Sequence, residues 1–231
     1  MAQKINPTSL RLGTTQIWNV FFQNYGKSYH VYFKILYKHL RILEVLNQIY
    51  LKKNIIIDHK NIWYSKNQVF LNIYYTNFLF SSKINYLLFL KVISQIIFKS
   101  YLTGGTTRFY LQSKWFTTAN LIGAYAQYLL NNLGSPKKLL WNICTLLQTH
   151  LNSYKISYSK NGPICIALKG FKIRIVGRFD NSKNQMSKSI EQYIGVLPLV
   201  CLNSHVEFLN KEIYTKLGVC SLQIWLFYKI Y

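Results

Sequence analysis

The spacing of apolar residues in the first half of the chain predicts helices and strands in alternation. Between Val31 and Tyr50 the apolar positions recur with helical spacing and form one broad face. Two runs rich in β-branched and aromatic residues follow, separated by four polar residues that suit a hairpin turn. Later, Gly104 and Gly105 have the residue type that ends a helix. The predicted order is α-β-β-α-β, with helices over 31–50 and 83–101 and strands over 55–64, 69–75 and 106–116.

A new pattern begins near residue 117, where helical spacing returns in two successive segments. The first covers 118–130 and stops at Gly134. Ser135 and Pro136 then have the residue types expected at an N-cap and at the first helical position. The helix that they begin is predicted to bury Leu140, Ile143, Leu147 and Leu151. From Ile164 onward the sequence is rich in strands, predicted over 171–178, in pieces over 196–208, and over 219–228.

Together these patterns predict an α+β fold with two domains, of which the second has a mostly antiparallel sheet. A chain of 231 residues is long enough for two compact cores. Residues 1–29 are polar and irregular, 30–116 form the first domain, and 117–231 form the second.

The net charge of the chain indicates which classes of molecule it binds. Lys and Arg number 28 against six Asp and Glu, which gives a formal charge of +22 at pH 7. This charge would repel itself in a free monomer, so it indicates a polyanionic partner, either nucleic acid or an anionic membrane. The basic residues are spread from Lys4 to Lys229, which suits a protein embedded in folded RNA better than one on a flat bilayer. A soluble basic protein without an anionic partner is a further alternative.

The membrane alternative depends on the apolar segment Ile84–Phe98. Its 15 residues are interrupted by Lys91 and Gln95, so it is too short to cross a bilayer and we expect no transmembrane segment. The amphipathic segment 83–101 would suit a basic peripheral protein on an anionic membrane surface, which is the alternative function.

The sequence argues against an enzyme. Its six carboxylates leave few pairs for acid–base catalysis, and its five His residues do not have the HExxH spacing of zinc proteases. The motifs GxGxxG, GxSxG and GxxxxGK followed by Ser or Thr do not occur. We expect no metal, no cofactor and no small-molecule substrate. The cysteines lie far apart among apolar neighbours, which predicts buried free thiols at Cys144, Cys165, Cys201 and Cys220.

One predicted strand, 171–178, alternates apolar and basic residues. Period-2 geometry places Phe171, Ile173 and Ile175 on one face and Lys172, Arg174 and Arg178 on the other. The cations would lie roughly 7 Å or more apart, comparable with the spacing of phosphates along RNA. The chain has five Arg, and two lie on this strand, which favours RNA binding over a merely solvated strand face.

A second basic feature lies in the first turn of the helix that Ser135 and Pro136 begin. Lys137 and Lys138 oppose the helix dipole there, at a cost of roughly 0.3–1 kcal/mol each if exposed. A nearby phosphate would offset this cost, because helix N-termini and lysines both attract anions. A chance arrangement of surface residues is the alternative.

Three blocks near the ends of the chain carry distinctive residues. The first is Met1–Pro7 followed by Leu10–Gly13, and the second is Gly170–Arg178. The third consists of Gly195–Leu199, Tyr214–Val219 and Leu222–Phe227. In this order and spacing the blocks resemble the family of the third protein of the small ribosomal subunit. That family has Gly-Ile-Lys-Val-x-Val-x-Gly-Arg at the second block, and Val-Pro-Leu, Tyr-Gly-Val and Val-Trp-Ile-Phe in the third.

The resemblance implies a KH-like RNA-binding domain (type II) for residues 30–116, followed by an α+β C-terminal domain. Members of the family bind ribosomal RNA in the head of the small subunit, beside neighbouring head proteins. They also help form the channel by which messenger RNA enters. Lys137 and Lys138 resemble the basic helix start that faces this channel, where the family has several more cations. The N-terminal block implies RNA contacts at Gln3, Lys4 and Arg11.

Two departures from the family pattern change where RNA is expected to bind. A KH domain holds the RNA backbone through a GxxG loop, and no glycine occurs between Tyr75 and Lys91. We therefore expect the contacts in the N-terminal tail and on the Lys172–Arg178 strand. Residues 152–168 have no counterpart in the family and are expected to add a hairpin.

The amino-acid composition indicates the compartment in which the protein is made. Phe, Tyr, Met, Ile, Asn and Lys, whose codons are A/T-rich, number 104 against 25 for Gly, Ala, Arg and Pro. The first seven residues lack the apolar core of a secretory signal and the Arg-rich character of a transit peptide. A protein made in a mitochondrion is the favoured interpretation, with a plastid or a bacterial cytoplasm as alternatives.

Overall fold

The computed structural model divides the chain into two compact units, each with its own sheet. One unit comprises residues 19–115, and the other comprises residues 1–18 together with 116–231. The structure describes residues 6–18, 28–53, 56–64, 68–76, 95, 104–111, 118–133, 135–179, 186–215 and 218–231.

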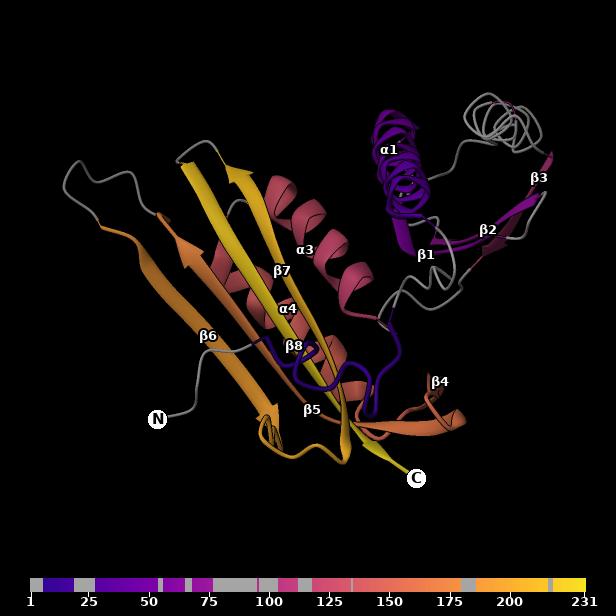
Figure 1. Cartoon of the computed structure of the whole chain (residues 1–231). Helices are drawn as coiled ribbons and strands as arrows, with labels where there is room; N and C mark the ends of the chain where they lie inside the picture. Colours follow the sequence, from indigo (N-terminus) through magenta and orange to yellow (C-terminus); the bar gives the residue numbers. More distant parts are fainter. Residues whose placement is uncertain are drawn as a thin grey trace. The chain divides into compact units, whose positions relative to one another are not determined.

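The unit of residues 19–115 contains a long helix and a three-stranded sheet (Figure 1). Its described elements are α1 (Tyr29–Lys53), β1 (Ile56–Tyr64), β2 (Gln68–Thr76) and β3 (Gly104–Leu111). β1 pairs antiparallel with β2, and β2 pairs parallel with β3. The first predicted helix and the first two predicted strands are confirmed, to within a few residues at each end.

Gly104 and Gly105 begin β3, where they lie opposite Gln68 and Val69 of β2. The residues just before them lie outside the described part of the chain, so the helix end predicted at these glycines stays a prediction. Glycine has little preference of its own for strand or helix, so the pairing with β2 decides its conformation. The helix predicted over 83–101 lies outside the described residues, apart from residue 95.

The core of this unit has contributions from the helix and from the sheet. Ile42 and Leu46 lie four residues apart on α1, so they share one face of the helix, and both are buried. Ile62 of β1 lies opposite Leu71 of β2, and both are buried with Ile73. The helical spacing predicts this face only in part, because Leu46 is buried but Leu40, which has the same spacing, is 52% exposed, and Ile42 is buried outside the predicted row.

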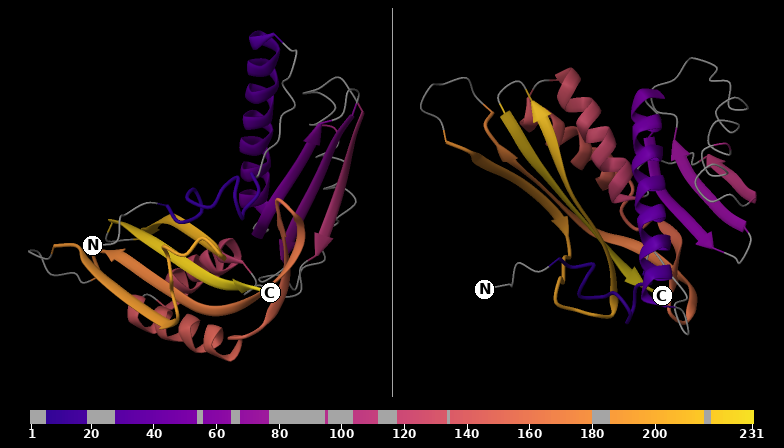
Figure 2. Two further views of the ribbon diagram at one scale, coloured as in Figure 1. Left: turned by 60° about the horizontal axis from the view of Figure 1, so that its bottom comes forward. Right: turned by 45° about the horizontal axis from the view of Figure 1, so that its top comes forward.

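The other unit has two helices and a five-stranded antiparallel sheet (Figures 1 and 2). The helices are α3 (Ala119–Leu133) and α4 (Pro136–Thr149). The strands are β4 (Tyr154–Ser159), β5 (Gly162–Gly177), β6 (Lys188–Gly195), β7 (Ser204–Thr215) and β8 (Gly218–Ile230). The strand order is β4-β5-β8-β7, and β6 also pairs with β5. The predicted α+β class with mostly antiparallel strands is confirmed.

Both helices cover one face of this sheet, as Figure 2 shows. Phe171, Ile173 and Ile175 of β5 point to that face and are fully buried, as their alternation predicts. Gly123 allows α3 to approach the sheet closely, because a Cβ at this position would lie 2.2 Å from Leu209 Cδ2. Among the described residues, neither helix of this unit covers the opposite face.

Two predictions in this unit need correction. Residues 196–203 are not part of a strand, and strand structure resumes only at Ser204. Pro198 lacks the N–H group that a strand interior needs, and Gly195 has a positive φ of 81° that ends β6. Leu151 is half-buried instead of buried, because α4 ends at Thr149.

The hairpin expected within 152–168 is present and formed by β4 and the start of β5. The strands pair from Tyr154 opposite Ala167 to Ser159 opposite Gly162. At the turn, the Ser159 hydroxyl donates to the Gly162 carbonyl at 3.0 Å. Among the described helices, none combines the length and the hydropathy that a membrane crossing requires.

Candidate nucleic-acid interface

Of the three RNA contacts expected in the N-terminal tail, only Arg11 lies among the described residues. Gln3 and Lys4 lie outside them. Arg11 is fully buried, and its Nη2 donates to the carbonyls of Leu199 and Cys201 at 2.9 and 2.7 Å. Its Nε donates to the Ser204 carbonyl at 3.0 Å. The expected role of Arg11 is therefore replaced by an internal one, since its guanidinium is enclosed by the chain.

The segment around Arg11 is held against the start of β7 at a second point. The Gln16 side-chain amide donates to the Val206 carbonyl at 2.8 Å. Gln16 Nε2 also lies 3.4 Å from Nδ1 of His205. The described part of the expected tail is thus packed on the second unit, and these bonds explain why residues 1–18 group with it.

Lys172 and Arg174 lie where their alternation predicts, on the face of β5 that the helices do not cover. Both approach one carboxylate of β6: Glu191 Oε2 is 3.0 Å from Lys172 Nζ and 4.0 Å from Arg174 Nε. Their side chains keep 30% and 40% of their exposure. Arg178 follows β5 and is half-buried. Glu191 therefore balances one of these two positive charges.

Aromatic side chains flank these cations, and the sequence alone did not single them out. Trp225 of β8 and Tyr193 of β6 both lie opposite Lys172 in the sheet. Lys172 Nζ is 5.8 Å from the centroid of the Trp225 ring, and Phe208 of β7 is 5.2 Å from the same ring. Cations beside aromatic rings suit RNA, whose bases stack while its phosphates attract charge. We call Lys172, Arg174, Tyr193, Phe208 and Trp225 the open sheet face.

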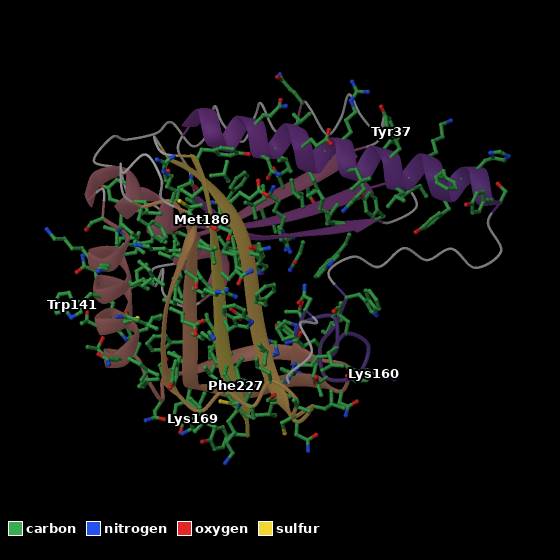
Figure 3. The ribbon with its side chains drawn as sticks, turned by 90° about the vertical axis from the view of Figure 1, so that its left-hand side faces the viewer. Tyr37, Trp141, Lys160, Lys169, Met186 and Phe227 are labelled. Carbon is green, nitrogen blue, oxygen red and sulfur yellow. The ribbon has the colours of Figure 1, made fainter. Side chains whose placement is uncertain are left out.

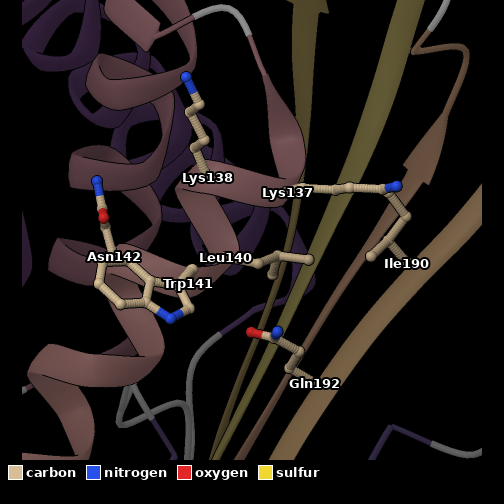
Figure 4. Close-up of a pocket in the computed structure, with 7 residues that line it drawn as sticks. All are labelled: Lys137, Lys138, Leu140, Trp141, Asn142, Ile190 and Gln192. Carbon is tan, nitrogen blue, oxygen red and sulfur yellow. The ribbon is translucent and has the colours of Figure 1, made fainter.

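Lys137 and Lys138 are exposed in the first turn of α4, as predicted. Pro136 is at the helix start, and Ser135 precedes it in extended conformation, but the Ser135 hydroxyl makes no capping bond. Together with Trp141, which is 64% exposed, the two lysines line an open hollow between α4 and β6. Figure 4 shows Lys137 directed toward Ile190 of β6 and Lys138 directed away from it.

The structure does not bring the two basic features together. Ile190 and Gln192, which line the hollow, lie opposite Ile175 and Ile173 of the buried row. The hollow therefore lies on the helix side of the sheet, whereas Lys172 and Arg174 lie on the other side. The second unit carries two separate basic surfaces.

The remaining titratable groups do not form a reactive site in the part of the chain that the structure describes. No three His, Cys, Asp or Glu side chains gather there as metal ligands. Cys144 and Cys220 are buried, whereas Cys165 and Cys201 are exposed, so the expectation of buried thiols is wrong for two of the four. Burial raises the pKa of the Cys144 thiol to about 11, which keeps it protonated at neutral pH.

Two comparisons with known proteins bear on the family of the chain. No family model matches it, but a known protein does. The chain is 43% identical over 228 residues to a protein of Chondrus crispus named small ribosomal subunit protein uS3m. The match covers 99% of this chain and 94% of that protein. Identity at this level along the whole chain shows that it belongs to the uS3 family of small ribosomal subunit proteins, in its organellar form.

Proposed function

We propose that the chain is a structural protein of the small subunit of the mitochondrial ribosome, where it binds ribosomal RNA in the subunit head. The observation that supports this most strongly is the 43% identity with the uS3m protein along 99% of the chain. Proteins of this family have a structural role, so the chain is not an enzyme. Its charge of +22 supports a partner made of RNA.

The unit of residues 19–115 is proposed to be a KH-like domain of type II. Support comes from the order of its elements, a helix followed by an antiparallel pair and then by a strand parallel to β2. Parallel neighbours need a long crossover connection, and residues 77–103 separate β2 from β3. The missing GxxG motif leaves ribosomal RNA to be bound mainly outside this domain.

The open sheet face and Arg178 are proposed to bind ribosomal RNA. Glu191 holds Lys172 and Arg174 in place on an exposed sheet, so their charges are positioned before RNA arrives. Phosphates bind such cations through charge-assisted hydrogen bonds, and Trp225 offers a ring beside them. This surface replaces the loop contact that the KH-like domain has lost.

Lys137 and Lys138 are proposed to face the channel by which messenger RNA enters, close to neighbouring proteins of the head. Both are exposed at a helix N-terminus, which attracts anions. Trp141 lies four residues after Lys137, so it presents its exposed ring on the same side of α4.

The test is the salt dependence of binding to small-subunit ribosomal RNA. The full chain should bind with an affinity that falls steeply as salt rises, because cations release counterions from the phosphates. Replacing Lys172 and Arg174 by Gln should weaken binding and reduce the slope of log Kd against log salt by about one per lost contact. The matched control replaces Lys34 and Arg41, two exposed cations of α1, by Gln and should change binding less.

Three outcomes would contradict the proposal or one of its parts. Weak binding that is insensitive to salt would exclude a phosphate-dominated contact. Flotation of the chain with anionic liposomes, without sedimentation with ribosomal subunits, would instead support the peripheral membrane alternative. Equal losses in the Lys172/Arg174 and Lys34/Arg41 variants would remove the assignment of RNA binding to the open sheet face.

A further inference from the structure

The hairpin of β4 and β5 exposes large side chains along one face. Tyr154, Ile156 and Tyr158 are 65%, 74% and 66% exposed. They alternate with Lys155 and Ser157, which are partly buried, so the three large residues share one side of the strand. Cys165, opposite Ile156 on β5, is also exposed. An apolar face of this kind marks a binding surface when no element of the chain covers it.

The end of β8 extends this face with another ring. The Tyr231 backbone N–H donates to the Cys165 carbonyl at 3.0 Å, which places Tyr231 beside the hairpin. Its ring is 57% exposed and lies 5.8 Å from the ring of Tyr154, centroid to centroid. Three tyrosines and Ile156 therefore form one continuous surface.

Lysines surround these rings. The Nζ atoms of Lys169 and Lys229 lie 5.9 and 5.4 Å from the centroid of the Tyr231 ring. Lys160 lies in the hairpin turn and is exposed, and Figure 3 shows it on the opposite side of the lower part of the view from Lys169. The nearby carboxylate of Glu207 binds Lys155, whose side chain points to the other side of β4. We call Tyr154, Ile156, Tyr158, Lys160, Lys169, Lys229 and Tyr231 the tyrosine–lysine patch.

The lysines of this patch favour RNA over protein as its partner. Tyrosine is enriched in protein interfaces and in RNA-binding surfaces alike, but lysine is depleted from protein interfaces. An exposed ring with flanking ammonium groups suits a base that stacks on the ring while adjacent phosphates bind the cations. None of the seven residues of the patch is acidic, so its local charge repels a basic partner and attracts RNA.

We propose that the tyrosine–lysine patch binds unpaired bases of ribosomal RNA by stacking, with Lys160, Lys169 and Lys229 on the neighbouring phosphates. The inference rests on the proposed function, because it needs a chain that binds ribosomal RNA. It adds a contact in a segment that the family blocks do not include. Stacking is tolerant of sequence, so the patch selects single-stranded structure more than a particular base.

The experiment measures binding of the full chain to a short oligouridylate and, separately, to small-subunit ribosomal RNA. Replacing Tyr154, Tyr158 and Tyr231 by Ala should weaken oligouridylate binding at least about fivefold for each ring that stacks, since one stacked base contributes about 1–3 kcal/mol. Replacing the same residues by Phe should preserve binding, because stacking needs the ring and not the hydroxyl. Tyr37→Ala, at a residue 65% exposed on α1, is the matched control and should bind as the unchanged chain does.

The outcomes separate this inference from the proposed function. If the unchanged chain binds neither RNA, the proposed function itself fails. If it binds ribosomal RNA while the Ala variant keeps full affinity for both probes, only the patch assignment is overturned. Phe variants as weak as the Ala variants would also overturn stacking. Loss of the Ala variant from ribosomal subunits, with unchanged binding to both RNAs, would show that the patch contacts a protein. Circular dichroism of each variant verifies that it is folded.

Discussion

At the scale of single residues, Arg11 shows how a family-like position can have a purely internal role. Its neighbours in the sequence suggest an RNA-contacting tail, whereas the structure encloses its guanidinium among carbonyls of residues 199–204. A buried charge is tolerated when several acceptors satisfy it, and the planar guanidinium reaches several at once. Arg11 therefore fixes the loop before β7 to the N-terminal segment.

Replacing Arg11 by Ala should lower the free energy of unfolding by at least about 3 kcal/mol, because several buried carbonyls lose their donor together. Arg11→Lys should also destabilise, since a single ammonium group cannot reproduce the fork of donors. Urea unfolding followed by circular dichroism measures both changes. Arg41→Ala, at an exposed cation of α1, is the control and should stay within about 0.5 kcal/mol of the unchanged chain. An equally small effect of Arg11→Ala would contradict the internal role.

His205 predicts how stability depends on pH. Its pKa is lowered to about 4, chiefly by burial, with smaller lowering contributions from Lys155 and Arg11 and an opposing one from Glu207. The unfolded chain binds a proton near pH 6.5, so stability is complete above that pH and falls by up to about 1.4 kcal/mol per pH unit down to about pH 4. Urea unfolding between pH 4 and 8 measures this slope. His205→Gln should flatten it, and an unchanged slope in that variant would rule His205 out as its source.

At the scale of elements, the residues that could be predicted are those whose spacing depends on one buried face. The apolar rows of α4 and β5 are each visible as a local period, and the structure buries them within these elements. The β4–β5 hairpin is expected from the sequence only because residues 152–168 have no family counterpart. Exposed and partly buried residues nevertheless alternate along β4 as regularly as in the other strands. The local spacing of apolar residues is enough to predict a helix or strand wherever one face of that element packs against a core.

Features that depend on pairing between distant residues could not be predicted. Trp225 lies beside Lys172 only because β8 pairs with β5 in one particular register. A shift of one residue would send the ring to the helix side, and no local pattern fixes that register. The place of Gly104 and Gly105 in β3 depends on pairing in the same way, since both glycines lie opposite residues of β2. The aromatic residues of the candidate site could therefore not be predicted, because the pairing of strands brings them beside the cations.

At the scale of the whole molecule, the distribution of charge over the second unit has a consequence for RNA binding. Lys137 and Lys138 lie on the helix side of the sheet, and Lys172 and Arg174 lie on the other side. Glu191 is the acid beside Lys172, while Ile190 and Gln192 line the hollow beside Lys137. One flat RNA surface cannot contact both sides at once, so the two pairs should contact different RNA segments.

This separation predicts that the losses of binding free energy add. The variant with all four cations replaced by Gln should lose affinity for assembled small subunits by the product of the losses of the two double variants, within about 0.5 kcal/mol. The physical reason is that distant sites without a common partner do not couple. Sedimentation with subunits measures the affinity of the three variants, which are compared with one another at each of several salt concentrations. A loss in the fourfold variant that equals the larger double loss would show that both pairs act on the same RNA segment, and it would contradict their placement on separate contacts.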